Sequence, residues 1–122
     1  MNSHKNQSFA TRLRCAWTGL KHAVRAEHSL KFQLGAFVLL VTFLIIVRPR
    51  PHWWALAMLA SGGVFAAELC NTAIEELADH LHPEVHARIR VVKDCAAAAV
   101  LVMVLGAIAV GIALLVSLVR RG

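Results

Sequence analysis

The amino-acid sequence predicts an all-α membrane protein, with one amphipathic helix at the membrane interface followed by three transmembrane helices. Of its 122 residues, 58% are hydrophobic and only 16% are charged, whereas soluble domains typically contain about 45–50% apolar and about 25% charged residues. Its apolar stretches are long enough to cross a hydrocarbon core about 30 Å thick. The chain is too short for two cores, so residues 9–122 are expected to form one domain after a polar, disordered segment, 1–8.

Residues 9–28 carry the pattern of a basic amphipathic helix. Apolar residues recur along one face at helical spacing: Phe9, Leu13, Ala16, Trp17, Leu20 and Val24. Basic residues occupy mainly the other faces. A basic helix with a tryptophan on its apolar face is typical of a helix lying in the membrane interface. The alternative is an ordinary surface helix packed on protein.

The three transmembrane helices are expected at residues 30–47, 53–82 and 94–119, with a polar connector at 83–94. Pro49 and Pro51 end the first, because proline cannot continue a helix. The second begins at Trp53-Trp54, and such aromatic residues are enriched at the membrane interface. Gly62-Gly63 and the alanines four residues later form small-xxx-small pairs, which allow another helix to approach closely.

The positive charges predict the orientation of the chain. Nine of the 13 lysine and arginine residues precede the first transmembrane helix, lie at its start (Lys31) or lie in the connector at 83–94. The positive-inside rule therefore places the N-terminus and this connector in the cytoplasm, and the C-terminus outside. Because the basic residues flank apolar stretches, their expected partner is an anionic lipid surface and not nucleic acid.

A polar stripe marks the second transmembrane helix. On a helix that advances about 100° per residue, Glu68, Asn71, Glu75 and Asp79 fall within an arc of about 80°, and at a rise of about 1.5 Å per residue the stripe is about 16 Å long. Acidic residues inside a transmembrane segment usually mark function. As alternatives, Glu75, Glu76 and Asp79 are merely a solvated helix end, and Glu68 makes a structural hydrogen bond to Asn71 or to a neighbouring helix.

The polar residues on the cytoplasmic side have the chemistry needed for phosphoryl transfer to a lipid. Glu27 and Glu75 offer hard oxygen ligands for Mg²⁺, which usually binds together with substrate phosphates. Lys93 supplies a positive charge for a phosphate, and Asp94 either orients this lysine or caps the third transmembrane helix. Glu68 lies deeper and is partly desolvated, which suits a general base acting on a lipid hydroxyl. Phosphoryl transfer needs mainly positioning and charge neutralisation.

Three segments of the sequence carry a family resemblance. They are Glu68-Leu69-Cys70-Asn71-Thr72-Ala73-Ile74-Glu75-x-x-x-Asp79, Pro83-Glu84-Val85-His86, and Val92-Lys93-Asp94-Cys95 with the four alanines that follow. This pattern resembles the prokaryotic diacylglycerol kinase family, which includes the undecaprenol kinases of Gram-positive bacteria. The likeness extends over roughly residues 9–119. P-loop and protein-kinase motifs are absent from the sequence.

The resemblance implies a small homotrimeric lipid kinase of the bacterial inner membrane. Its active sites would be shared between protomers, with MgATP as the phosphate donor. In this comparison Glu68 corresponds to the general base, and Glu27 and Glu75 to the metal-binding acids. The other expected site residues are Asn71, Lys93 and Asp94 in catalysis, and Arg12, Asp79, Glu84 and His86, again with Lys93 and Asp94, around the nucleotide. The expected reaction converts diacylglycerol to phosphatidic acid.

Two observations leave alternatives open. After Glu27 the diacylglycerol branch of the family has Ala-Ala-Phe-Arg-Gln-Glu, whereas this chain has residues 28–33, His-Ser-Leu-Lys-Phe-Gln, which is closer to the undecaprenol branch. An intramembrane Glu68 is also compatible with a proton-linked channel or small transporter. Against a channel, the other polar residues stay at one membrane face. A purely structural subunit would leave Glu27 and Lys93 without a role.

Overall fold

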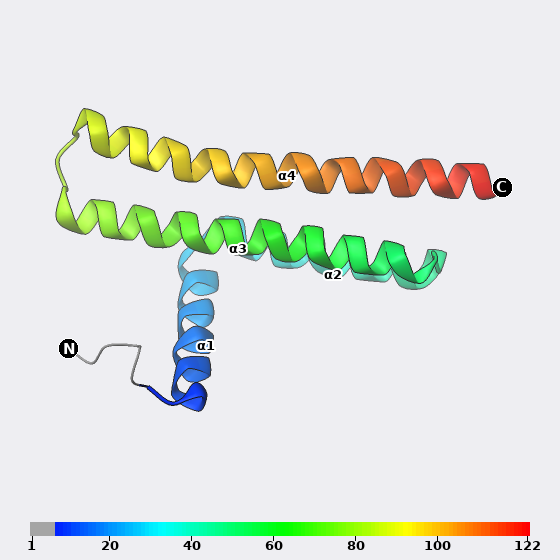
Figure 1. Cartoon of the computed structure of the whole chain (residues 1–122), viewed down its shortest axis with the longest axis horizontal. Helices are drawn as coiled ribbons and strands as arrows, with labels where there is room; N and C mark the ends of the chain where they lie inside the picture. The colour runs from blue at the N-terminus through cyan, green and yellow to red at the C-terminus, as the bar shows by residue number, and fades with distance from the viewer. Residues whose placement is uncertain (1–6) are drawn as a thin grey trace.

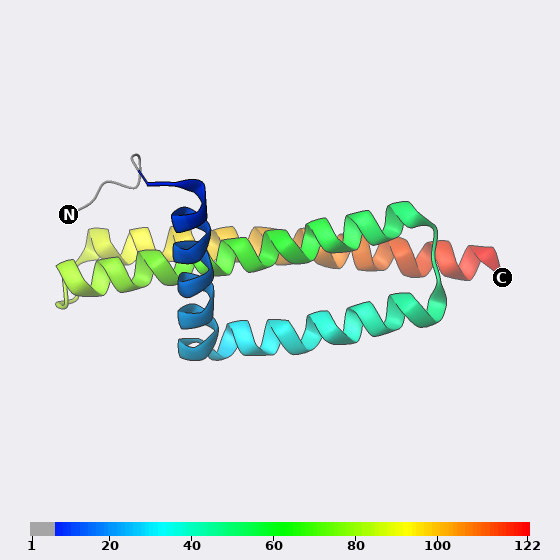
Figure 2. The ribbon, with the colours of Figure 1, turned by 90° about the horizontal axis from the view of Figure 1, so that it is seen from below.

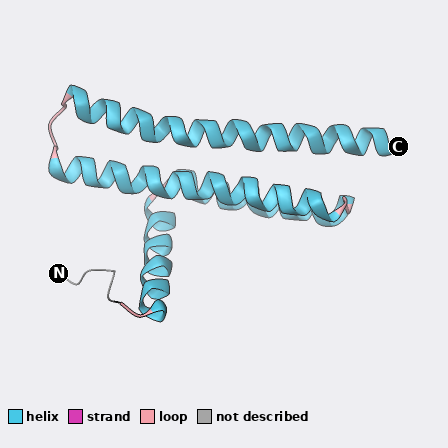
Figure 3. Cartoon of the chain, viewed as in Figure 1, coloured by secondary structure: helices cyan, strands magenta, loops and turns pink. Residues whose placement is uncertain are grey.

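The computed structural model describes residues 7–122, which form four α-helices and no strand (Figure 3). The helices are α1 (Phe9–Ala26), α2 (His28–Val47), α3 (Pro51–Leu81) and α4 (Ala87–Arg121). Of these, α2, α3 and α4 are long and apolar enough to cross a membrane. The expected all-α membrane class is therefore confirmed.

The longest helices, α3 and α4, form an antiparallel pair that packs along its length (Figure 1). Helix α2 runs beside α3, and α1 lies across α2 and α3 instead of along them (Figure 2). The loop between α3 and α4 lies at one end of the helix bundle, and the C-terminus lies at the other. This arrangement gives the protein two distinct polar ends.

Helix α1 has the exposed apolar face that the interfacial interpretation requires. The side-chain oxygen of Ser8 accepts a hydrogen bond from the backbone N–H of Thr11 at 3.3 Å, and this cap sets the start of α1. Phe9 is 74% exposed and Trp17 is 60% exposed, so the other residues of the range 7–122 do not cover them. Ser8 is thus part of the ordered structure. The rest of the expected disordered segment falls largely on residues 1–6, which are outside the described range.

A single residue separates α1 from α2. Glu27 has an extended backbone with φ −108° and ψ 122°, and its N–H donates to the carbonyl of Ala23 at 2.9 Å. One extended residue is enough to redirect the chain, so α2 begins already at His28. The turn places the Glu27 carboxylate at the corner between the interfacial helix and the first transmembrane helix.

The proline-containing turn between α2 and α3 forms where the sequence predicts it. Helix α2 ends at Val47, and Arg48 adopts a left-handed conformation with φ 51° while its N–H donates to the carbonyl of Leu44 at 2.9 Å. Pro51 occupies the first position of α3, where its missing N–H removes no helical hydrogen bond.

The helix that contains the last transmembrane segment begins before the expected residue 94. Helix α4 begins at Ala87, and the side chain of His86 caps it by accepting a hydrogen bond from the backbone N–H of Arg88 at 3.1 Å. The expectation located the helix by its apolar run, but a helix can continue into water through good helix formers such as arginine and lysine. The connector shrinks to 82–86, and Asp94 is not a cap.

The protein core of the single chain is small. Leu44, Ala57 and Leu114 form a buried cluster between α2, α3 and α4, whereas most large apolar side chains of the transmembrane helices are exposed. Exposed apolar faces on three spanning helices suit contact with lipid or with other transmembrane helices. Helices α3 and α4 approach closely at Gly63, where an added β-carbon would overlap the methyl group of Met103.

Candidate active site

The polar stripe lies on one uninterrupted helix. Helix α3 runs from Pro51 to Leu81, so Glu68, Asn71, Glu75 and Asp79 share one face. Glu68, Asn71 and Glu75 are half-buried, and Asp79 is exposed. The stripe therefore passes from a shielded environment beside the first turn of α2 to an open one near the α3–α4 loop.

Helix α2 supplies a partner for the deepest carboxylate. The hydroxyl of Ser29 donates to Oε2 of Glu68 at 3.5 Å, which is at the long limit for such a bond. The sequence does not predict this contact, although Ser29 follows Glu27 closely in the chain. The bond engages only one carboxylate oxygen. It also joins Glu68 to a neighbouring helix, which agrees with the alternative that Glu68 makes a structural hydrogen bond. The second oxygen remains available for chemistry.

Asn71 lies one turn from Glu68 and has an unused acceptor. Its Oδ1 atom is buried and receives no hydrogen bond from the residues described. Buried side-chain polar atoms are nearly always hydrogen-bonded. The amide is thus suited to accept a hydrogen bond from a molecule that is not part of this chain.

A polar pocket of about 360 Å³ lies at the other end of the stripe, between α3, α4 and the loop that joins them. It is lined by Asp79, His82, Pro83, Glu84, Val85, His86, Ile89, Arg90 and Lys93. Lys93 of α4 forms an ion pair with Asp79 of α3 across this pocket. The pocket brings together four of the six residues that the sequence suggests for the nucleotide.

The other two expected nucleotide residues do not line this pocket. Asp94 follows Lys93 on a helix, so its side chain points about 100° away, and it is exposed. Arg12 is exposed on the first turn of α1. Conversely, Arg90 lines the pocket but was not among the expected site residues. Its position three residues before Lys93, on the same helical face, is the sequence signal that would have identified it.

Two side-chain contacts involve residues on either side of the expected metal ligands, Glu27 and Glu75, in the sequence. His22 of α1 contacts Glu76 of α3 with 3.5 Å between Nε2 and Oε1, and Ser29 of α2 contacts Glu68. Glu27 lies between His22 and Ser29 in the chain, and Glu75 lies between Glu68 and Glu76. The turn at Glu27 therefore lies near the part of α3 between Glu68 and Glu76.

The donor set around these acids fits Mg²⁺ held jointly with a nucleotide. In the range 7–122, no group of three or more histidine, cysteine or acidic side chains is placed to hold a metal ion. Mg²⁺ in phosphoryl-transfer enzymes commonly uses one or two carboxylates and completes its coordination with phosphates and water. Two hard carboxylates and the unused Oδ1 of Asn71 meet that need. Assignment of Glu27 and Glu75 as metal ligands stays a prediction.

Comparison with known proteins decides the family. Residues 14–115 match the family described as "Prokaryotic diacylglycerol kinase". The chain belongs to this family. It is 31% identical over 99 residues to a diacylglycerol kinase of Synechocystis sp., covering 80% of this chain and 57% of that protein. It is 32% identical over 87 residues to the undecaprenol kinase of Bacillus subtilis, covering 71% of each.

The family assignment confirms the resemblance found in the sequence. The family and both relatives carry the names of lipid kinases, and none of these names is that of a channel or an assembly subunit. The two relatives differ in their named acceptor lipid at almost the same identity. The chain spans 57% of the length of the Synechocystis relative.

Proposed function

We propose that this prokaryotic diacylglycerol kinase family member transfers the γ-phosphate of ATP to the hydroxyl of diacylglycerol, giving phosphatidic acid. Undecaprenol is the alternative acceptor. The observation that carries the proposal is the arrangement of α3. This helix connects a half-buried carboxylate, Glu68, to Asp79 in a polar pocket, a separation of about 16 Å at a rise of about 1.5 Å per residue.

Glu68 acts as the general base in this proposal. It takes the proton of the lipid hydroxyl while the hydroxyl oxygen attacks the γ-phosphorus. The bond from that phosphorus to the oxygen it shares with the β-phosphate breaks, and ADP leaves. The contact with Ser29 holds Oε2, which leaves Oε1 to accept the proton. A half-buried carboxylate at this depth can meet a hydroxyl near the lipid headgroups.

The polar pocket and the turn at Glu27 hold the nucleotide. Lys93, Arg90 and His86 provide donors for phosphate or ribose oxygens, and the ion pair with Asp79 keeps Lys93 directed into the pocket. Glu27 and Glu75 would hold Mg²⁺, which would neutralise phosphate charge. The amide Nδ2 of Asn71 would donate a hydrogen bond to a γ-phosphate oxygen, and its unused Oδ1 would be free to face the metal ion.

The remaining expected residues have supporting roles. Glu84 lies on the rim of the pocket, where it can contact the nucleotide base or ribose. Asp94 and Arg12 do not reach this pocket within the chain, so we assign them to a site completed by a neighbouring protomer of a homotrimer. The small core of the single chain supports such an assembly. The charge distribution supports an orientation with the N-terminus in the cytoplasm and the C-terminus outside.

Lipid phosphorylation by the purified protein in mixed micelles tests the proposal. Each acceptor, diacylglycerol or undecaprenol, is supplied separately with MgATP, and the phosphorylated lipid is measured. Faster phosphorylation of diacylglycerol supports the proposal, and faster phosphorylation of undecaprenol selects the alternative. If wild-type protein phosphorylates neither lipid while Glu68→Gln gives the same background, the kinase proposal fails.

A further inference from the structure

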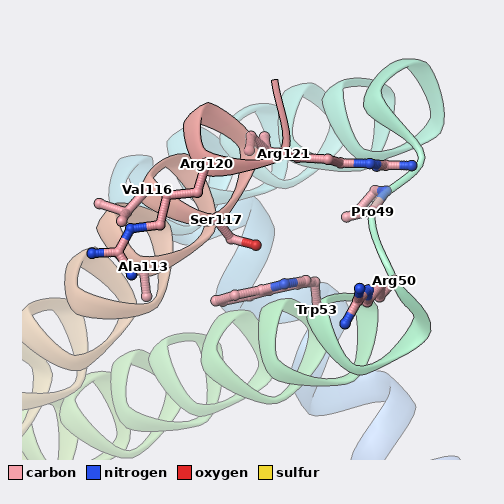
Figure 4. Close-up of a pocket in the computed structure, with 9 residues that line it drawn as sticks. Pro49, Arg50, Trp53, Ala113, Val116, Ser117, Arg120 and Arg121 are labelled. Carbon is pink, nitrogen blue, oxygen red and sulfur yellow. The ribbon is translucent and has the colours of Figure 1, made fainter.

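A second large cleft lies at the end of the helix bundle opposite to the polar pocket. Its volume is about 740 Å³, and it lies between the α2–α3 turn and the last turns of α4 (Figure 4). Its lining residues are Pro49, Arg50, Trp53, Ala113, Val116, Ser117, Leu118, Arg120 and Arg121. None of these residues takes part in the proposed kinase mechanism.

The rim of this cleft is cationic. Arg50 stands beside Trp53, and the guanidinium of Arg121 extends towards the α2–α3 turn, where its Nη1 donates to the carbonyl of Arg48 at 3.4 Å (Figure 4). Arg120 points along the outer surface of α4 instead. Among residues 7–122, no carboxylate forms an ion pair with any of these arginines. Their charge is therefore available to an external anion.

The start of α3 adds to this positive potential. Arg50 is the residue that precedes the helix, and within the described chain no side chain caps this end. The first N–H groups of a helix lack intrahelical acceptors, and the helix dipole makes this end partly positive. Arginine binds phosphate oxygens through two N–H groups at once. A phosphate is the anion best matched to the rim.

The floor of the cleft is apolar. Trp53 and Leu118 pack against the buried cluster formed by Leu44 and its neighbours, while Ala113 and Val116 continue the apolar surface of α4. The hydroxyl of Ser117 is the polar group directed between α4 and Trp53 (Figure 4). Tryptophan is enriched at the headgroup level of membranes. A cationic rim above an apolar floor fits an amphiphile better than a soluble anion.

We propose that this cleft binds an anionic phospholipid from the leaflet on that side of the membrane. Arg50 and Arg121 hold the headgroup phosphate, Ser117 offers a hydrogen bond to the headgroup or glycerol, and the first carbons of an acyl chain lie against Trp53 and Val116. The site is separate from the kinase site, because the two lie at opposite ends of α3 and α4.

Fluorescence quenching of Trp53 tests this site. In a Trp17→Phe/Trp54→Phe background, Trp53 is the single tryptophan. The protein is placed in phosphatidylcholine nanodiscs that contain a small fraction of either phosphatidylglycerol or phosphatidylcholine, brominated near the top of the acyl chain. Brominated phosphatidylglycerol is expected to quench Trp53 more strongly at equal mole fraction. Equal quenching by the two lipids would overturn the proposal.

Arg50→Gln and Arg48→Gln form a matched pair of variants for a second experiment, which measures phosphatidylglycerol binding by the same quenching. Both remove one charge from the same turn, but the Arg48 side chain does not line the cleft. Arg50→Gln is expected to weaken phosphatidylglycerol binding about tenfold, the scale of one lost charge-assisted hydrogen bond to the headgroup phosphate. Arg48→Gln is expected to change it less than twofold. Equal losses of phosphatidylglycerol affinity in the two variants would show that only general surface charge matters. That result would contradict a specific site in the cleft.

Two further arms identify the ligand and guard against misfolding. Soluble glycerol phosphate is expected not to relieve the quenching, whereas excess unbrominated phosphatidylglycerol is expected to relieve it. Relief by soluble glycerol phosphate would show a site for free anions and overturn the lipid assignment. If Arg50→Gln loses helicity by circular dichroism, Arg121→Gln replaces it with the same expected loss, and retained affinity in that variant contradicts the proposal.

Discussion

Substitution of Gly63 tests the close approach of α3 and α4. A methyl group at this position would overlap the terminal methyl of Met103, which belongs to the facing helix. Gly62 is a matched control, because a β-carbon there meets no heavy atom of the described chain within 4 Å. Both positions lie inside the same helix, so Gly→Ala changes the same intrinsic helix propensity.

The expected energies follow from two opposing terms. Replacing glycine by alanine in a helix interior stabilises it by roughly 1 kcal/mol. At Gly63 this gain is opposed by overpacking, which typically costs about 1–3 kcal/mol, and the flexible Met103 side chain keeps the cost near the lower end. Gly62→Ala should therefore stabilise the protein, and Gly63→Ala should be less stable than Gly62→Ala by about 1–2 kcal/mol.

Reversible unfolding in mixed detergent micelles measures this difference. In the double variant Gly63→Ala/Met103→Ala the overlap disappears. The overpacking cost of Gly63→Ala to the free energy of unfolding should therefore vanish in the Met103→Ala background. Equal stabilities of Gly62→Ala and Gly63→Ala, with no coupling to Met103, would refute the packing of α3 against α4.

Three further predictions concern the site. Glu75→Gln should raise the Mg²⁺ concentration for half-maximal activity about tenfold, the scale of a lost charged contact. Glu76→Gln, which removes only the negative charge that faces His22, should not; indistinguishable Mg²⁺ titrations would reject Glu75 as a ligand. Lys93→Gln should raise the KM for ATP about tenfold, and an unchanged KM would exclude a phosphate contact. Ser29→Ala should lower kcat no more than about fivefold, because a hydrogen bond contributes about 1 kcal/mol; a hundredfold loss would mean that Ser29 is itself essential.

Local features of the fold were predictable because the sequence encodes them directly. Pro49 cannot continue α2, and Pro51 suits the first position of α3, where its missing N–H removes no helical hydrogen bond. Stretches of apolar residues identify three spanning helices. The helical period places Glu68, Asn71, Glu75 and Asp79 on one face without knowledge of any neighbour. Such signals act within a few residues of the chain.

Features that depend on packing were not predictable. The apolar run indicates where α4 enters the membrane. It does not reveal that the helix begins earlier, at Ala87. The partner of Glu68 is Ser29, 39 residues away in the sequence, and only the path of α2 past α3 brings them together. The ion pair of Asp79 with Lys93 similarly depends on how α3 and α4 align. The family pattern anticipated several of these residues, but not their contacts.

Glu68→Gln provides the most direct test of the central claim that Glu68 is the base for a lipid hydroxyl. Glutamine keeps the size of the side chain and can still accept the hydrogen bond from Ser29, but it cannot take a proton at this position. Lipid phosphorylation and ATP binding are measured on the same purified variant. The account predicts that kcat falls by at least ~10² while ATP affinity stays within about twofold of wild type. Turnover within a few-fold of wild type would contradict it.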